Sequence, residues 1–219
     1  MITSGPTRQY LDPVRYLTNA SSGRMGAALA RAAIDRGHDV IVISGPVQVE
    51  YPTAAEIVRV NTTDEMLAEA TRHFLDCDGA IGAAAPCDYM PREVSEQKLS
   101  KTGDPIRLEL IETPDVVATL GQSKRLPNAE QPGQWVVGFA LETEDRRFRA
   151  IVKLERKHCD LMVSNGPQAI DNEHNEVELL DPQGQVLSQI QGSKEQVAQR
   201  LLHEIDVRLI EKSTGTVGT

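Results

Sequence analysis

Eight residues near the N-terminus have a composition suited to anion binding. The segment Asn19-Ala-Ser-Ser-Gly-Arg-Met-Gly26 precedes a stretch with helical periodicity. Glycines let the backbone approach a ligand, and free N–H groups at a helix start attract phosphate. Ser21 or Ser22 is expected to cap this helix. Contact with a substrate or phosphate is predicted for Ser21, Ser22, Gly23, Met25 and Gly26, although a capped glycine-rich turn that binds nothing explains the pattern equally well.

A second cluster, Gly82-Ala-Ala-Ala-Pro-Cys-Asp88, overlaps the end of a predicted strand. In doubly wound sheets, ligands bind just beyond the carboxyl ends of the strands. Asp88 is therefore a candidate for contact with a ligand or a metal ion, and its alternative role is to cap the next turn. Cys87 is interpreted as a small neighbour of this site, because no histidine lies in a position that suggests a nucleophilic pair.

Four lysines could supply positive charge for a bound polyphosphate. Lys98 and Lys101 lie in a polar segment, whereas Lys153 and Lys157 are spaced to share one face of a predicted helix. The pattern of the helical pair alone favours a solvated surface. The five histidines form no HxH or HExxH set, so a zinc ion held by protein side chains is not expected.

Two further segments join strand ends to helix starts. They are Thr113-Pro-Asp-Val-Val117 and Gly138-Phe-Ala-Leu-Glu-Thr143. Phe139 could form the wall against which a base or ring packs. Its alternative role is that of a core side chain.

These segments need a sheet and helices to position them, and the periodicity predicts an α/β protein with a mainly parallel sheet. Helices are expected over residues 22–36, 64–75, 114–120, 146–158 and 194–210. Strands are expected at 1–4, 38–44, 57–60, 79–85, 108–111, 135–140 and 161–164. Residues 176–180 and 185–190 are expected to form an antiparallel hairpin. Residues 92–107 and 121–134 are interpreted as loops, residues 1–212 as one domain, and residues 213–219 as a disordered tail.

Composition limits the classes of function. The 219 residues have a net charge of −9, which disfavours nucleic acid and anionic membrane surfaces as partners. The three cysteines form no CxxC pair, and neither a signal peptide nor a membrane span is expected. A cytoplasmic protein with reduced thiols is the simplest interpretation. An anionic substrate would then need locally clustered lysines.

The chain resembles the phosphopantothenate–cysteine ligase family over about residues 1–212. The matching stretches are ITSGPTRQYLDPVRYLTNASSGRMG, VISGPV, AAAPCDYMP, EQKLSK, TPDVV, VGFALET and KLERKHCDLMVSN. The resemblance implies a Rossmann-like sheet with an added antiparallel region and a homodimer. It also implies a ligase of coenzyme A biosynthesis that joins 4′-phosphopantothenate to L-cysteine. CTP is used with Mg²⁺ to form an acyl-cytidylate, from which cysteine displaces CMP.

The resemblance also implies roles for individual residues. Asn19 holds the acyl-cytidylate, and Lys98 acts in the second step. Mg²⁺ is bound mainly through the nucleotide phosphates. We add the hypothesis that Arg15 contacts the substrate phosphate, with a structural salt bridge as the alternative. The implied nucleotide-binding residues are Gly82, Ala83, Ala84, Asp88, Lys98, Pro114, Asp115, Val116, Val117, Phe139, Lys153 and Lys157.

Departures from the family pattern and other functions leave alternatives open. Ser100 stands where the bacterial family often has a further lysine, and Pro86 where an aliphatic residue is common. CTP and ATP therefore both remain candidate nucleotides. The rival functions are an NAD(P)-dependent oxidoreductase, disfavoured because GxGxxG is missing, and an inactive nucleotide-binding subunit. A flavin-dependent phosphopantothenoylcysteine decarboxylase is a candidate partner.

Overall fold

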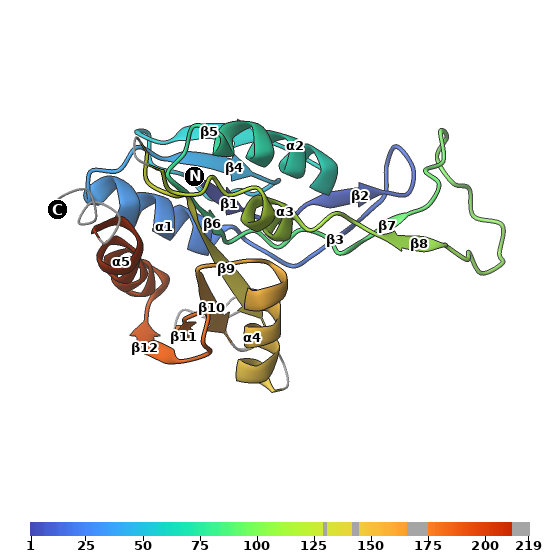
Figure 1. Cartoon of the computed structure of the whole chain (residues 1–219). Coiled ribbons are helices and arrows are strands. Elements are labelled where there is room, and N and C mark those ends of the chain that lie inside the picture. The colour runs from blue at the N-terminus through green and yellow to red at the C-terminus, as the bar shows by residue number, and fades with distance from the viewer. Residues whose placement is uncertain (129–130, 142–144, 166–174, 212–219) are drawn as a thin grey trace.

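The computed structural model of the chain describes residues 1–128, 131–141, 145–165 and 175–211, and its centre is one large sheet (Figure 1). Within these residues the sheet has eight strands in the order β12-β11-β10-β9-β6-β1-β4-β5. The six strands from β10 to β5 are parallel, and β11 and β12 add an antiparallel hairpin at the edge. The strands are β1 (Ile2–Ser4), β4 (Ile41–Ser44), β5 (Glu56–Arg59), β6 (Gly79–Gly82), β9 (Trp135–Leu141), β10 (Leu161–Asn165), β11 (Asn175–Leu180) and β12 (Val186–Gly192).

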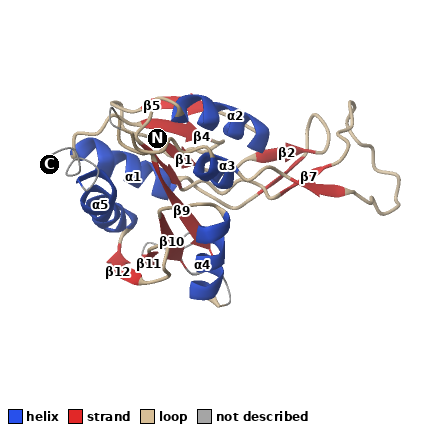
Figure 2. Cartoon of the chain, viewed as in Figure 1, coloured by secondary structure: helices blue, strands red, loops and turns tan. Residues whose placement is uncertain are grey.

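Helices cover both faces of the sheet (Figure 2). Neighbouring strand residues point to opposite faces, so Val42 packs in one apolar cluster and Ile43 in the other. The cluster around Val42 includes α1 (Arg24–Asp35) and α5 (Lys194–Ile205), and α5 continues into a π-helical turn, η2 (Asp206–Ile210). The cluster around Ile43 includes α2 (Thr63–Phe74), α3 (Val116–Gln122) and α4 (Arg146–Arg156). The predicted Rossmann-like α/β fold class is thereby confirmed.

Two helix starts differ from the prediction. The helix expected from Pro114 begins at Val116, because the Asp115 carboxylate accepts a hydrogen bond from the Ala118 N–H and makes Asp115 the N-cap. The α1 N-cap is Gly23 with a φ of 75°, and it provides no side-chain cap. Ser21 and Ser22 therefore do not cap α1, and the first N–H groups of this helix have no intrahelical acceptor.

Two hairpins form an arm that projects from the body of the molecule (Figure 1). They pair β2 (Arg8–Tyr10) with β3 (Tyr16–Thr18), and β7 (Tyr89–Pro91) with β8 (Leu110–Glu112). We call residues 8–18 and 89–112 the arm. The sequence predicted only β8, at 108–111. Residues 92–107 contain no helix or strand, as expected.

The remaining sequence expectations concern the tail and membranes. The predicted disordered tail, residues 213–219, lies outside the described residues. Among the described residues, no helix has both the length and the apolar character needed to cross a bilayer.

Candidate functional site

A cleft lies at the point where the sheet reverses its strand order. From β1 the chain moves to β4 and β5 on one side, and it later places β6 and β9 on the other. The strand order thus reverses at β1, and doubly wound folds bind ligands in the crevice beyond the carboxyl ends of the strands at such a point. Thr3 of β1 and Gly82 of β6 line it.

The cleft consists of two chambers. The chamber beside α3 has a volume of about 540 Å³, and the chamber beside the start of α1 has about 370 Å³. We call them the α3 chamber and the α1 chamber. They share the wall residues Ala84, Pro86, Asp88, Phe139 and Lys157, so one ligand could extend through both.

The structure brings most of the predicted site residues to this cleft. In the α1 chamber lie Asn19, Ser21, Ser22, Gly23, Met25, Gly26, Ala83 and Lys153. In the α3 chamber lie Gly82, Pro114, Asp115, Val116 and Val117. Ala84, Asp88, Phe139 and Lys157 line both chambers.

Asn19 fastens the loop after β6 to the glycine-rich segment before α1. Its Nδ2 donates to the carbonyl oxygen of Pro86 at 2.8 Å. Both backbone groups of the next residue, Cys87, are also held. Its N–H donates to Thr7 Oγ1, and its carbonyl accepts from the Thr113 hydroxyl at 2.7 Å. These bonds fix the backbone from which the exposed Asp88 side chain enters the cleft.

Asp115 links α3 to α4 at the cleft wall. Besides capping α3, its carboxylate lies 3.0 Å from Lys157 Nζ and 3.7 Å from the Arg156 guanidinium. Lys157 is thereby held in place as a half-buried cation that lines both chambers.

Gly82 allows the α3 turn to approach the end of β6. A Cβ atom added to Gly82 would lie 2.4 Å from Cγ2 of Val117, too close for any real contact. The absence of a side chain therefore sets how near the Pro114–Val117 turn lies to the sheet.

Positive charge gathers in the α1 chamber although the whole chain is acidic. Among the described residues that line it, the basic ones are Arg24, Lys153, Lys157 and Lys194, and the acidic one is Asp88. This is the local clustering that an anionic substrate requires. Half-buried Phe139 forms a wall of both chambers, which suits a ring, and it also packs against the core.

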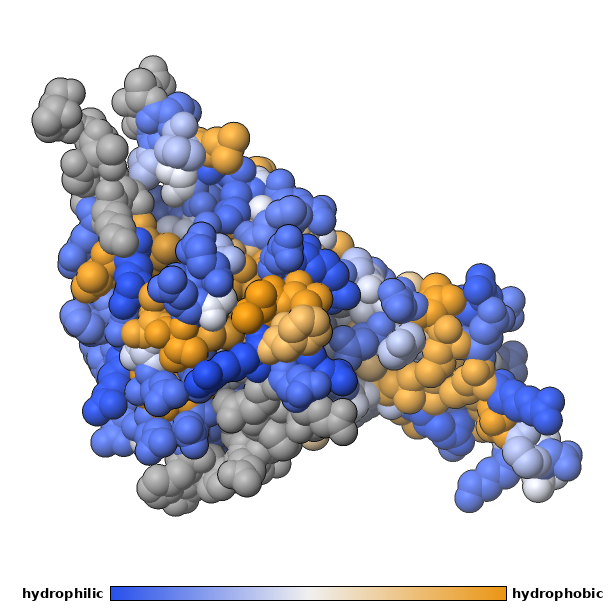
Figure 3. All heavy atoms as spheres, turned by 60° about the horizontal axis from the view of Figure 1, so that its bottom comes forward, coloured by the Kyte–Doolittle hydropathy of each residue, from blue (hydrophilic) through white to orange (hydrophobic). Residues whose placement is uncertain are grey.

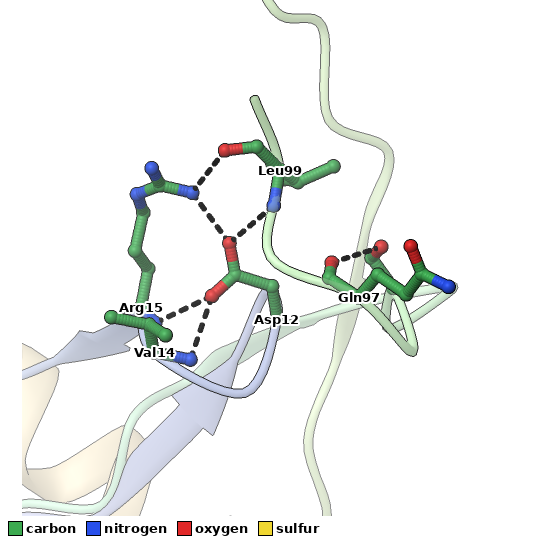
Figure 4. Close-up of polar contacts among 6 residues, drawn as sticks. Asp12, Val14, Arg15, Gln97 and Leu99 are labelled. Atoms are coloured by element: carbon green, nitrogen blue, oxygen red, sulfur yellow. Dashed lines mark hydrogen bonds and ion pairs between the residues drawn. The ribbon is translucent and has the colours of Figure 1, made fainter. Parts of the chain in front are cut away.

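Two predicted site residues lie on the arm and do not line either chamber of their own chain: the exposed Lys98, between β7 and β8, and Arg15, in the β2–β3 hairpin. Arg15 forms an ion pair with Asp12 and donates to the Leu99 carbonyl (Figure 4). The structural salt bridge considered for Arg15 is therefore present. Both contacts use Nη1, and no contact of Nη2 or Nε is seen among the described residues.

Asp12 is the centre of that contact and is fully buried. Burial acts to raise its pKa, but the N–H groups of Val14, Leu99 and Arg15, together with the Arg15 guanidinium, outweigh this effect. They lower the pKa of Asp12 to about 2. A charged Asp12 thus joins the two hairpins of the arm.

Several residues that line the cleft were not predicted from the sequence. They include Thr3, Glu112, Gln122, Arg156, Asn165, Asn175 and Lys194. Arg24 and Thr113 also line the cleft, and they lie within segments that the sequence singled out without giving them a role. The available signal was position, because Glu112 and Asn165 end strands whose carboxyl ends reach the cleft. For a metal ion, no group of three or more His, Cys, Asp or Glu side chains is arranged to hold one in the described part of the chain.

Comparisons with known proteins agree with this architecture. Residues 1–209 match the family described as DNA/pantothenate metabolism flavoprotein C-terminal domain. The Escherichia coli (strain K12) coenzyme A biosynthesis bifunctional protein CoaBC is 38% identical over 220 residues, which is 97% of this chain and 52% of the relative. The protein of the same name from Vibrio vulnificus (strain YJ016) is 37% identical over 211 residues, 94% of this chain and 51% of the relative. The chain thus spans about half the length of the curated relatives it matches.

Solved structures share the fold. A crystal structure of the C-terminal domain of a coenzyme A biosynthesis bifunctional protein CoaBC has a TM-score of 0.77 and 32% identity, covering 96% of this chain and 94% of the other. A Cab2 mutant in complex with phosphopantothenate-cysteine has a TM-score of 0.78 at 16% identity, covering 100% of this chain and 88% of the other, which supports the fold alone. From the family match over residues 1–209, the chain belongs to the DNA/pantothenate metabolism flavoprotein C-terminal domain family.

Proposed function

We propose that this chain is a phosphopantothenate–cysteine ligase of coenzyme A biosynthesis, acting in the cytoplasm. The observation that carries the proposal is the cleft itself, which combines Asn19, Asp88 and Phe139 with clustered cations at the switch point of the sheet. The relatives named for coenzyme A biosynthesis support the same reaction.

The proposed reaction has two displacement steps. The carboxylate of 4′-phosphopantothenate attacks the α-phosphorus of CTP, an O–P bond forms, and pyrophosphate leaves. The cysteine amine then attacks the acyl carbon, CMP leaves with the bonding electron pair, and the amine loses a proton. The first step brings a carboxylate to a triphosphate, and the second develops an oxyanion at the acyl carbon, so donors that spread negative charge lower both barriers.

The residues of the cleft suit these demands. The Asn19 amide is a neutral donor that needs no change of protonation to bind an oxyanion. Lys153 and Lys157 offset phosphate charge, and Phe139 offers a wall for the base. For Mg²⁺, the exposed carboxylate of Asp88 is a hard oxygen ligand that fits beside nucleotide phosphates, where the ion supplies further charge neutralisation.

The arm supports a dimer. Its exposed apolar side chains form a patch, seen as orange spheres on the projecting part of the surface (Figure 3). The exposed large apolar or aromatic side chains of the arm include Val14, Tyr16, Tyr89, Val94, Ile106, Leu108 and Leu110. Such an area on a projecting element marks a contact surface. In the proposed homodimer, each arm packs on the other copy and brings Arg15 and Lys98 to the partner's cleft.

The first test measures pyrophosphate release by purified protein with Mg²⁺, 4′-phosphopantothenate and either CTP or ATP, with and without L-cysteine. We expect release that depends on 4′-phosphopantothenate, is faster with CTP, and gives the amide product when cysteine is present. An Asn19→Ala variant should retain the fold and lose about a hundredfold or more in amide formation.

The opposite outcome identifies the rivals. No release with either nucleotide, despite nucleotide binding, would mean an inactive nucleotide-binding subunit.

Because the curated relatives are about twice as long and are named bifunctional, a flavin-dependent phosphopantothenoylcysteine decarboxylase is the proposed partner. The same assay must therefore also be run with this decarboxylase added.

A further inference from the structure

Asn175 is the first residue of β11. Within the described part of the chain, the oxygen of its side-chain amide has a hydrogen-bond partner and the nitrogen has none. The residue is 3% exposed, and its Oδ1 accepts a hydrogen bond from Lys194 Nζ at 3.2 Å. An ammonium group only donates, so the carbonyl side of the amide faces Lys194 and the NH₂ side faces elsewhere. No hydrogen-bond partner for this Nδ2 is found among the described residues. Buried donors of this kind are rare and call for a partner.

The β11–β12 hairpin holds Asn175 and Lys194 in fixed positions. Asn175 is paired across the ladder with Gly192, two residues before Lys194. Ser193 and Gln196 form a capping box that fixes the start of α5 at Lys194. The pair therefore depends on backbone geometry and is not a chance contact of two mobile side chains.

Both side chains line the α1 chamber together with the start of α1. The first turn of α1 presents N–H groups without an intrahelical acceptor, and Gly23 supplies no side chain to cap them. Arg24, Lys153 and Lys157 add positive charge, against the one carboxylate of Asp88 among the described lining residues. Donors and cations from three helices and a hairpin thus surround one volume.

We propose that Asn175 and Lys194 form a phosphoryl-binding subsite of this cleft, in which Asn175 Nδ2 and the Lys194 ammonium both donate to one phosphate group. The subsite deepens the proposed ligase function and relies on it for the identity of the ligand. Two ligands carry the required chemistry: the terminal phosphates of the nucleotide and the phosphate of 4′-phosphopantothenate.

Calorimetric titration of the full chain in Mg²⁺ buffer separates these sources. The probes are pyrophosphate, CTP and CMP on one side, and 4′-phosphopantothenate and pantothenate on the other. The variants are Asn175→Asp, which keeps the shape, removes the donor and adds a negative charge, and Lys194→Gln, which removes a positive charge. Arg200→Gln is the matched control, because it removes one charge from the exposed surface of the same helix.

We expect both cleft variants to weaken binding of one phosphorylated set at least tenfold. The matching probe that lacks the phosphates in question, CMP for the nucleotide or pantothenate for the substrate, should stay within twofold of wild type. Loss of pyrophosphate and CTP binding assigns the subsite to the nucleotide, and loss of 4′-phosphopantothenate binding assigns it to the substrate. If Asn175→Asp, a change at a buried position, lowers the melting temperature, the affinities measured for Lys194→Gln alone decide whether the subsite binds phosphate.

Unchanged affinities for all probes in Lys194→Gln overturn the subsite, as does a wild-type chain that binds neither pyrophosphate nor 4′-phosphopantothenate. The subsite and the proposed function can fail separately. Pyrophosphate binding that depends on Lys194, in a chain with no turnover, retains the subsite and rejects the ligase. Normal turnover together with unchanged probe binding in both variants rejects the subsite and retains the ligase.

Discussion

At the scale of single residues, Lys157 shows how the cleft keeps a cation available. Its ammonium is paired with Asp115, which also caps α3. A partly exposed ion pair contributes only about 0–1 kcal/mol, so a phosphate can share Lys157 at little energetic expense. Asp115 retains its bond to the Ala118 N–H when that happens, and the helix start is preserved. We therefore interpret Asp115 as a residue that positions Lys157.

Gly82 offers a direct test of the packing between the Pro114–Val117 turn and the sheet. In Gly82→Ala, the new Cβ would meet Val117 Cγ2 at 2.4 Å, so the turn must move outward. Overpacking of this kind costs about 1–3 kcal/mol, and we expect a lower melting temperature and about tenfold weaker CTP binding. The double variant Gly82→Ala/Val117→Ala removes Cγ2 of Val117, so it should restore most of the melting temperature and most of the CTP affinity. If the losses of the two single variants instead added together in the double variant, the contact would be contradicted.

The buried thiol of Cys159 should be chemically inert in the native protein. Burial, partly offset by Lys157, raises the pKa of Cys159 to about 12. Since the thiolate is the reactive form, iodoacetamide at pH 8 should label half-buried Cys77 well before Cys159. Peptide mass spectrometry measures the order, with guanidinium-unfolded protein as the control in which all three cysteines react. Equal native rates at Cys77 and Cys159 would contradict the assigned burial.

At the scale of elements, the body of the fold could be predicted and the arm could not. Strands such as β4 and β9 are apolar runs that a buried parallel sheet requires. Cleft residues lie at the carboxyl end of β9 and directly after β6, as Phe139 and Ala83 show. In contrast, β2, β3 and β7 have three residues each and carry no clear apolar alternation. Each hairpin is formed within one segment. The join between the two hairpins depends on contacts between residues 87 apart in the chain, such as Asp12 with Leu99. Sequence order could not place Lys98 and Arg15 relative to the cleft for the same reason.

The join between the two hairpins should depend on pH through Asp12. Its folded pKa of about 2 lies below the ordinary value of about 3.9, so ionised Asp12 stabilises the arm above about pH 4. This contribution is lost as the pH falls from about 4 to 2. The protection factors of the Val14 and Leu99 amides, which correct exchange for its intrinsic pH dependence, should therefore fall across that range in the wild type.

Asp12→Asn supplies the control for this effect. The variant keeps an acceptor oxygen but has no charge to lose, so its protection factors at pH 6 should already be lower and should change little down to pH 2. Its melting temperature should lie a few degrees below that of the wild type at pH 6 and should approach it at pH 2. A constant difference between the two proteins at all pH values would assign the effect to groups other than Asp12.

At the scale of the whole molecule, the arm and the cleft are complementary parts that lie apart in one chain. Arg15 keeps its Nη2 and Nε groups without a seen contact among the described residues, while Nη1 holds Asp12 and Leu99. The cleft holds Asn19 and gathers cations in its α1 chamber. If dimerisation places the arm of one copy over the cleft of the other, each site needs residues from both chains, and activity requires association.

Mixing two inactive variants tests this arrangement. Arg15→Ala and Asn19→Ala should each lose most ligase activity. Mixed dimers contain one cleft that pairs an intact Asn19 with the partner's intact arm. Statistical pairing in a two-fold dimer predicts recovery to about a quarter of wild-type activity after the variants are dissociated and reassociated together. Each variant treated alone is the control, and sedimentation velocity verifies that dimers reform. If Arg15 served its own cleft, every site in the mixture would lack one residue and no activity would return.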